Sequence, residues 1–106
     1  MTTLLKEWLI ANEYPLDNLN AVGKYGNSPI MKACREANIT VVDELISLGV
    51  DLNIKNVDGN SALWNSCFGN SYECFEALVK AGIDIDSQNV NDVTSLMYCA
   101  SAGKDD

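Results

Sequence analysis

The four cysteines of the chain, Cys34, Cys67, Cys74 and Cys99, are the side chains whose chemistry needs explaining first. An even number of cysteines could form a disulfide framework, and suitably spaced cysteines could bind zinc. However, no two of them are separated by only two residues, and the chain contains no histidine. This inventory opposes a metal site, and we predict none.

Catalytic chemistry is also poorly supported. The absence of histidine removes the usual base that would activate a serine or cysteine nucleophile. The 15 acidic residues show no spacing that pairs two carboxylates in a pocket, and the glycines are scattered rather than gathered in a phosphate-binding loop. We therefore predict that the protein is not an enzyme and uses no cofactor.

The composition limits the classes of partner. With 7 basic and 15 acidic residues, the chain has a formal net charge of −8, which opposes binding to a nucleic-acid backbone. No apolar run approaches the length that crosses a membrane. We expect a protein partner, no nucleic acid and no membrane, and the acidity permits a basic partner.

The chemically interesting side chains must be positioned by a repeat. Residues 26–34 (GNSPIMKAC) return 33 residues later as residues 59–67 (GNSALWNSC), and more faintly as residues 92–100 (DVTSLMYCA). A fixed period of this length is typical of a solenoid of stacked units, each too small to bury its own apolar face. Such an architecture favours a binding surface over a catalytic pocket.

Each unit predicts a turn, a short helix, a tight turn, a second helix and an extended loop. Ser28 is a good N-cap and Pro29 a good first residue for the first helix. Residues 41–48 carry the apolar stripe of the second helix, which Gly49 should end in a left-handed conformation. Residues 51–59 then cross to the next unit as a projecting, hairpin-like loop, which we call a finger, and residues 20–26 and 84–92 correspond to it.

On these motifs the chain resembles the ankyrin-repeat proteins. The family's Thr-Pro-Leu-His motif appears as residues 28–31, 61–64 and 94–97, and its Gly-Ala-Asp stretch as residues 49–51 and 82–84. The resemblance covers roughly residues 16–106 and implies an all-α solenoid of helix-turn-helix units with projecting hairpin-like loops. Met31, Trp64 and Met97 replace the motif histidine, so the ties between units that it forms in the family must come from packing or other polar groups.

The expected organisation is an N-terminal capping helix with its connection (residues 1–19), with Thr3 as N-cap, followed by repeats over residues 20–106. These divide into units at 20–52, 53–85 and 86–106, the last of which is partial. The third unit lacks a second helix, so its first helix would lose its apolar cover. We expect a truncated or naturally abbreviated end. The alternative is a covering partner, or self-association through the uncovered C-terminal unit.

The repeat also gives the cysteines an interpretation. Cys34 and Cys67 occupy the same position in units that stack about 8–10 Å apart, beyond the roughly 7 Å Cα limit of a disulfide. Cys99 occupies the position of Ala33 and Ser66, where a small residue is needed. We expect buried thiols in a reducing compartment and hence a cytoplasmic location.

The resemblance implies that partners bind at the finger tips and on the exposed side of the first helices. The predicted contact residues are the positions there that differ between units: Lys24, Tyr25, Asn27, Arg35, Val57, Asp58, Asn60, Phe68, Val90, Asn91, Val93 and Ser101. Tyr25 and Phe68 are the best candidates for anchors. The two finger valines, Val57 and Val90, could equally pack finger against finger, and we expect Trp64 to be structural.

Charge should be distributed unevenly over the two sides of the solenoid. Asp43, Glu44, Glu73 and Glu76 fall on the second helices and should form a solvated outer face. Lys24, Lys32 and Arg35 fall on the inner side of the first unit, which should be less acidic than the total charge suggests.

The sequence favours a non-enzymatic adaptor, a protein–protein interaction module that binds through its concave helix face and loop tips. The alternative is a small acidic inhibitor or immunity-type protein that neutralises a basic protein such as a toxin or nuclease. An inhibitor of this kind should bind with strong salt dependence, whereas an adaptor that uses Tyr25 and Phe68 should be nearly insensitive to salt. A third alternative is one module of a larger repeat protein.

Overall fold

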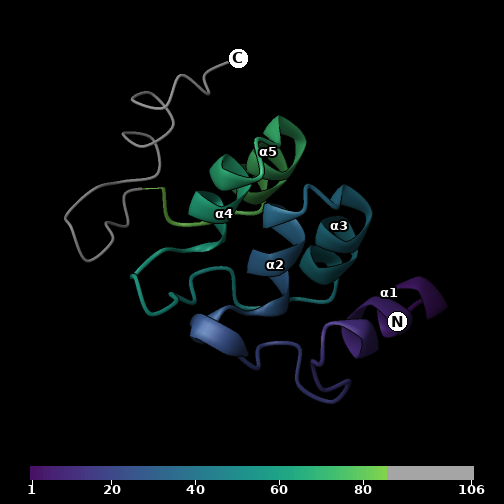
Figure 1. Cartoon of the computed structure of the whole chain (residues 1–106). Helices are drawn as coiled ribbons and strands as arrows, with labels where there is room; N and C mark the ends of the chain where they lie inside the picture. Colours follow the sequence, from purple (N-terminus) through teal and green to yellow (C-terminus); the bar gives the residue numbers. More distant parts are fainter. Residues whose placement is uncertain (86–106) are drawn as a thin grey trace.

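The structure, a computed structural model, describes residues 1–85, and this part of the chain contains helices and no strand (Figure 1). The elements are α1 (Thr3–Ala11), the 3-10 turn η1 (Lys24–Gly26), α2 (Pro29–Arg35), α3 (Ile39–Ser47), α4 (Ala62–Phe68) and α5 (Tyr72–Lys80). The expected third unit, residues 86–106, lies outside the described residues. So do its predicted contact residues Val90, Asn91, Val93 and Ser101.

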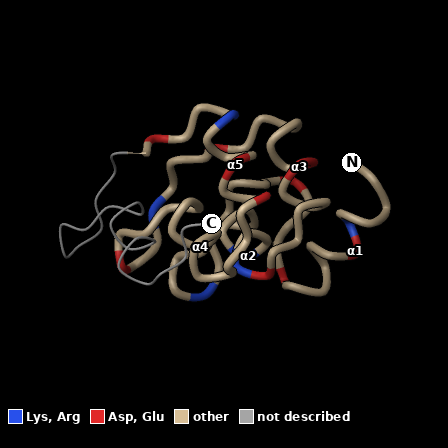
Figure 2. Tube along the Cα trace, turned by 90° about the horizontal axis from the view of Figure 1, so that it is seen from above, with Lys and Arg blue, Asp and Glu red and all other residues tan. Residues whose placement is uncertain are grey.

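The helices form two rows (Figures 1 and 2). The first helices of the two units, α2 and α4, pack side by side, and the second helices α3 and α5 pack together behind them. Helix α1 packs against α3 and extends the second row, where it takes the place of a second helix. The described residues therefore follow the predicted order of turn, helix, turn and helix twice, after a single capping helix.

One apolar core runs between the two rows. Its fully buried members come from all five α-helices and include Leu5, Leu9, Ile30, Met31, Val42, Leu45, Leu63 and Leu78. The second helices contribute one stripe each, whereas α4 is buried from Ala62 to Cys67, so a unit can bury its apolar residues only against its neighbours. Met31 and Trp64, which stand where a histidine was expected, are 0 % and 4 % exposed and pack as core residues.

The helix ends show which local predictions hold. Gly49 and Gly82 adopt φ of +80° and +92°, which confirms the predicted left-handed end of both second helices. The first helix of the first unit begins after Ser28 as expected, although the Ser28 side chain makes no capping hydrogen bond. The expected N-cap Thr3 is wrong by one residue, because the Thr2 hydroxyl accepts the Leu5 N–H at 3.2 Å.

Asparagine side chains tie each finger to the next one along the chain. The Asn20 Oδ1 accepts the backbone N–H of Asp51 at 2.8 Å, and the Asn53 Oδ1 accepts that of Asp84 at 2.9 Å. The two bonds are the same interaction, repeated one period apart. A third tie runs from the Asn56 amide Nδ2 to the Asn27 Oδ1, at 2.9 Å. Other polar groups therefore do connect the units, as the loss of the motif histidine required.

The cysteines differ from the expectation of buried thiols in one respect. Cys34 and Cys74 are free and fully buried, as predicted. Their mutual hydrogen bond, together with burial, raises the pKa of the Cys34 thiol well above its usual value. Cys67, however, is disulfide-bonded, so the prediction of a free thiol is wrong there. The register argument considered only Cys34 as its stacked neighbour and overlooked other partners.

None of the helices within residues 1–85 is both long enough and apolar enough to cross a membrane.

Candidate functional site

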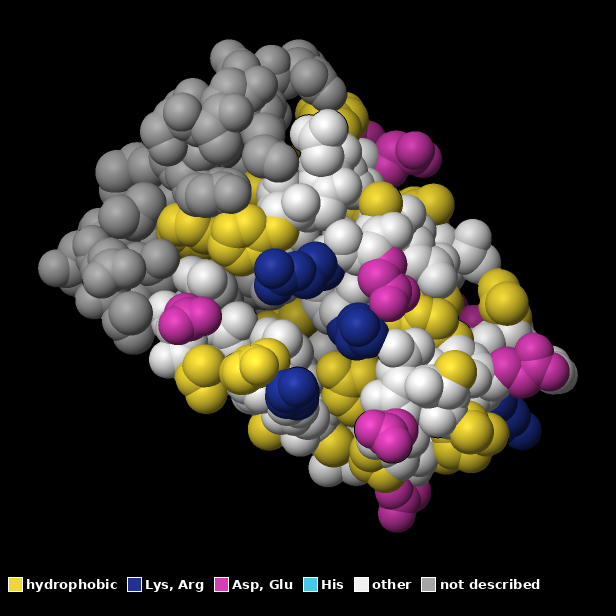
Figure 3. Space-filling model, in the orientation of Figure 1, with side chains coloured by type: hydrophobic (Ala, Val, Ile, Leu, Met, Phe, Trp, Pro, Cys, Tyr) yellow, Lys and Arg dark blue, Asp and Glu magenta, His cyan; other side chains and the backbone are white. Residues whose placement is uncertain are grey.

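The fingers and the exposed side of α2 and α4 form one continuous surface, which we call the finger face. It consists of the exposed or half-buried side chains of Lys24, Tyr25, Lys32, Arg35, Glu36, Val57, Asp58 and Phe68. Figure 3 looks onto this surface and shows Lys and Arg side chains in a row over the first unit, with hydrophobic side chains between and beside them.

Tyr25 is the most unusual residue of the finger face. It is 63 % exposed and adopts φ +61° and ψ +17° in the turn that the hydrogen bond from Gly26 N–H to Gly23 O closes at 3.0 Å. That turn position favours glycine or asparagine, because a side chain there strains the backbone. Asp58, the corresponding residue of the second unit, does not adopt a positive φ. The strain at Tyr25 is thus a property of this finger and not of the repeat.

The two finger tips are joined through backbone. The Tyr25 carbonyl accepts the Val57 N–H at 3.0 Å, so the exposed Tyr25 ring and the 65 % exposed Val57 side chain belong to adjacent tips. The Lys24 ammonium lies over the Tyr25 ring, 5.2 Å from its centre. Val57 is thus bonded to the neighbouring finger through its backbone, and its side chain is mostly exposed.

Asn27 and Asn60 support the finger tips from below. Asn60 is only 6 % exposed, and its N–H and carbonyl are both bonded to Asn56, at 3.0 Å each. The structure therefore removes Asn60 from the contact surface on which it was predicted. Asn27 is half-buried, and its Oδ1 is used in the bond to Asn56. The side chain that holds the second tip is that of Asn56, because its Oδ1 accepts the backbone N–H groups of Asp58 and Asn60 at 3.0 Å each.

The far end of the finger face is a cation stacked on an aromatic ring. The Arg35 guanidinium at the end of α2 lies 5.1 Å from the centre of the Phe68 ring at the end of α4. Phe68 in turn lies 6.1 Å from the Trp64 ring, which is almost fully buried. Phe68 is therefore a half-buried platform, anchored from below and covered in part by Arg35.

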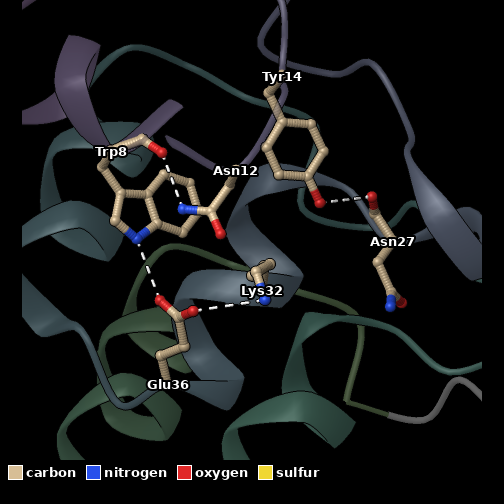
Figure 4. A network of polar contacts seen from close by, with 6 residues as sticks. All are labelled: Trp8, Asn12, Tyr14, Asn27, Lys32 and Glu36. Atoms are coloured by element: carbon tan, nitrogen blue, oxygen red, sulfur yellow. Dashed lines mark hydrogen bonds and ion pairs between the residues drawn. The ribbon is translucent and has the colours of Figure 1, made fainter. Parts of the chain in front are cut away.

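A polar network from the capping helix holds the middle of the finger face (Figure 4). The Trp8 indole N–H donates to the Glu36 Oε1 at 3.0 Å, and the Lys32 Nζ lies 3.4 Å from the Glu36 Oε2. The Trp8 and Tyr14 rings stack with their centres 6.2 Å apart, and the Tyr14 hydroxyl donates to the Asn27 carbonyl at 2.9 Å.

Burial, and secondarily the nearby Glu36 carboxylate, raises the pKa of Tyr14, which therefore remains a hydrogen-bond donor at neutral pH. Sequence reasoning missed this network. Its only sequence signal was that two aromatic residues, Trp8 and Tyr14, precede the first complete unit.

The opposite side of the molecule differs in charge. A groove of about 580 Å³ runs between α3 and α5, and its lining includes the carboxylates of Asp43, Glu73 and Glu76. Figure 2 shows acidic residues along both helices. Lys80 pairs with Glu76 at 3.2 Å, and hydrogen bonds from Lys80 and Tyr72 lower the pKa of Glu76. The predicted separation of an acidic outer side from the basic residues of the first unit is present in the folded chain.

The predicted contact residues fall into two groups in the folded chain. Within residues 1–85, no three cysteine or acidic side chains come together in a way that could hold a metal ion. Of the predicted contact residues, the structure brings Lys24, Tyr25, Val57 and Asp58 together at the finger tips. It pairs Arg35 with Phe68 at the helix ends.

A comparison with protein-family models agrees with this architecture. The model described as ankyrin repeats, in three copies, matches residues 2–89 and residues 31–106. No curated protein sequence matches the chain. The family-model match includes both described units, the capping helix and the residues beyond them, and it confirms the predicted all-α repeat solenoid.

Proposed function

Because the chain belongs to the ankyrin-repeat family, whose repeats are generally non-enzymatic protein–protein interaction modules, we propose that it binds a protein partner through the finger face. The supporting observation is Tyr25. A left-handed conformation costs a residue with a side chain roughly 1–2 kcal/mol, and here it holds a 63 % exposed aromatic ring. Backbone strain of this kind is concentrated at functional sites, where another benefit offsets its cost.

The neighbouring groups complete an anchor of the kind that protein interfaces use. Aromatic residues are enriched among the side chains that dominate binding energy, and they sit among contacts that exclude water. The Lys24 ammonium lies over the Tyr25 ring, the exposed Val57 is bonded to Tyr25 through the backbone, and Asp58 adds a polar rim. The half-buried Phe68 platform provides a second apolar contact on the same surface.

The test is the substitution Tyr25→Asn. Asparagine tolerates the left-handed conformation, so the variant loses the ring while the turn remains relaxed. Dodecapeptides are first selected from a random displayed library on the immobilised wild-type chain, and their affinities are then measured by fluorescence polarisation. We expect Tyr25→Asn to weaken the selected peptides by roughly 5- to 30-fold, the effect of losing an interface anchor, and to leave thermal stability equal or higher.

The matched control is Tyr72→Asn. Tyr72 is 58 % exposed, close to the value for Tyr25, but it lies at the start of α5 on the outer side. It should leave peptide affinity unchanged. If Tyr25→Asn binds the peptides as well as the wild-type chain does, the finger face is not the binding surface.

The groove between α3 and α5 favours a second candidate function, the neutralisation of a basic protein. Its carboxylates Asp43 and Glu73 would face such a partner, whereas the finger face carries the opposite charge. For this candidate, Asp43→Lys combined with Glu73→Lys should abolish binding of a cationic model protein such as lysozyme, while Tyr25→Asn should not affect it. If the Asp43→Lys, Glu73→Lys variant binds lysozyme as tightly as the Tyr25→Asn variant does, the groove is not the binding site.

A further inference from the structure

We propose that the finger face recognises an acidic segment of a protein, in which carboxylates lie beside an apolar or aromatic side chain. This inference rests on the proposed function and adds the chemistry of the partner. It starts from a contrast: in a chain with a net charge of −8, three of the seven basic residues, Lys24, Lys32 and Arg35, lie on this one surface.

Two of these three cations have no acidic partner within residues 1–85. Neither Lys24 nor Arg35 forms an ion pair with any residue in the described part of the chain. Lys32 is paired with Glu36, and the Trp8 N–H occupies the other oxygen of that carboxylate. Glu36 is therefore already satisfied. The remaining acidic residue of the surface, Asp58, leaves two unpaired cations against one carboxylate.

Both unpaired cations lie against an aromatic ring. Lys24 is 5.2 Å from the centre of the Tyr25 ring, and Arg35 is 5.1 Å from that of Phe68. A cation that already lies over a ring loses less side-chain conformational entropy when it binds a carboxylate. Its N–H donors that point away from the ring remain available for that carboxylate. Each pair thus presents a charge for a carboxylate and an apolar surface for the carbon atoms next to it. The same two-part site occurs at both ends of the surface.

The three cations of the finger face all belong to the first unit, whereas the second unit has Lys55 in its finger and Lys80 on α5. The residues one period after Lys24, Lys32 and Arg35 are Val57, Asn65 and Phe68, which are uncharged. On the second unit the finger face carries Val57, Asp58 and Phe68, while Asn65 is buried.

Acidic protein segments fit this surface better than a nucleic acid. A polyanionic backbone gains most of its affinity from many phosphate contacts, and two unpaired cations supply few of them. The acidic outer side, with its carboxylates on α3 and α5, would also repel a long polyanion. A short segment with a few carboxylates needs only the local charges, which act over about one Debye length of 8 Å at physiological salt.

The test uses the dodecapeptide selection described above, with the full chain. We expect the enriched peptides to contain more Asp and Glu than Lys and Arg, together with at least one apolar or aromatic residue. Lys24→Glu combined with Arg35→Glu should lower their affinity roughly tenfold or more, and high salt should weaken binding to the wild-type chain.

The matched control is Lys6→Glu combined with Lys80→Glu, which gives the same net charge but places the new acids on α1 and α5. It should change affinity by less than about twofold, because screening removes most of the effect of distant charges. A loss of affinity equal to that of the finger-face variant would mean that total charge, and not this surface, determines binding.

The inference and the proposed function fail differently. Peptides that depend on Tyr25 but are neutral or basic, or that tolerate Lys24→Glu with Arg35→Glu, would overturn the acidic partner and leave the binding face intact. Peptides that do not depend on Tyr25 would overturn both. Labelled single-stranded oligothymidine that binds more tightly than the peptides, and is lost in the same variant, would replace the protein segment with a nucleic acid.

Discussion

Gly69 is the residue at which the stacking of the two units can be tested most directly. It ends α4 with an ordinary φ of −76°, so its role is not conformational freedom. A Cβ atom built there would lie 2.5 Å from the Cys34 carbonyl oxygen and 2.6 Å from that of Arg35. Both atoms belong to the backbone at the end of α2. The substitution Gly69→Ala would therefore force α2 and α4 apart.

The size of the effect follows from these distances. Ordinary contacts of a Cβ atom are 3.4–4 Å, so the methyl group would overlap two oxygens that cannot rotate away. Overpacking costs typically about 1–3 kcal/mol, and the rigid backbone places Gly69→Ala near the upper end. Replacing glycine also reduces the entropy of the unfolded chain, which offsets about 0.4–1 kcal/mol. We expect the free energy of unfolding to fall by about 2 kcal/mol.

Gly49→Ala is the matched control, because its cost comes from backbone conformation and not from a steric clash. A Cβ atom there meets nothing within 4 Å, but φ is +80°. The left-handed conformation costs about 1–2 kcal/mol, and the same entropic gain offsets part of it. The net loss should be about 1 kcal/mol or less, clearly smaller than that of Gly69→Ala.

Urea unfolding followed by far-ultraviolet circular dichroism measures both variants, with the tryptophan fluorescence of Trp8 and Trp64 as a second probe. The reasoning is refuted if Gly69→Ala lies within about 0.5 kcal/mol of the wild-type chain, the range typical of a neutral surface change. It is also refuted if Gly49→Ala is the more damaging of the two, since α2 and α4 would then not approach as closely as the structure shows.

Two further substitutions test the attachment of the capping helix. Tyr14→Phe should lower the free energy of unfolding by about 0.5–1.5 kcal/mol in urea, because it removes the hydroxyl that donates to the Asn27 carbonyl. This carbonyl keeps its bond from the Gly23 N–H. Unchanged stability would mean that the Tyr14 hydrogen bond does not form. Glu44 accepts hydrogen bonds from the hydroxyl and N–H of Thr2, which lower its pKa from the usual 4.5. Its contribution to the free energy of unfolding is therefore present above pH 4.5 and is lost as the pH falls through the lowered pKa. The urea midpoint of the wild-type chain should therefore exceed that of Glu44→Gln at neutral pH, with a gap that narrows in acid, and a gap independent of pH would contradict the tether.

The repeat is broken at Gly69 for a reason that the sequence does not reveal. Its counterpart one period earlier is Glu36. Within residues 1–85, the helix before α2 is α1, which packs in the other row, and the Glu36 side chain reaches Trp8 and Lys32. At Gly69 the same room is filled by the end of α2. The difference between the two residues becomes meaningful only when the neighbouring unit is in place.

Local features of this protein could be predicted from its sequence, because the interactions that produce them lie within one turn or one helix. The period of 33 residues, the order of helices and the left-handed glycines at Gly49 and Gly82 all belong to this class. The basic character of the first unit also follows from residue types alone, since charges at known repeat positions need no packing to be placed on a side of the solenoid.

The tertiary structure decided whatever depends on groups far apart in the chain. Asn20 and Asn53 tie one finger to the next because each meets a backbone N–H 31 residues away. Tyr25 was held in a strained conformation while its carbonyl received the Val57 N–H of the neighbouring finger. Repeat positions predict which way a side chain faces, but hydrogen bonds between neighbouring units decide whether it stays available to a partner.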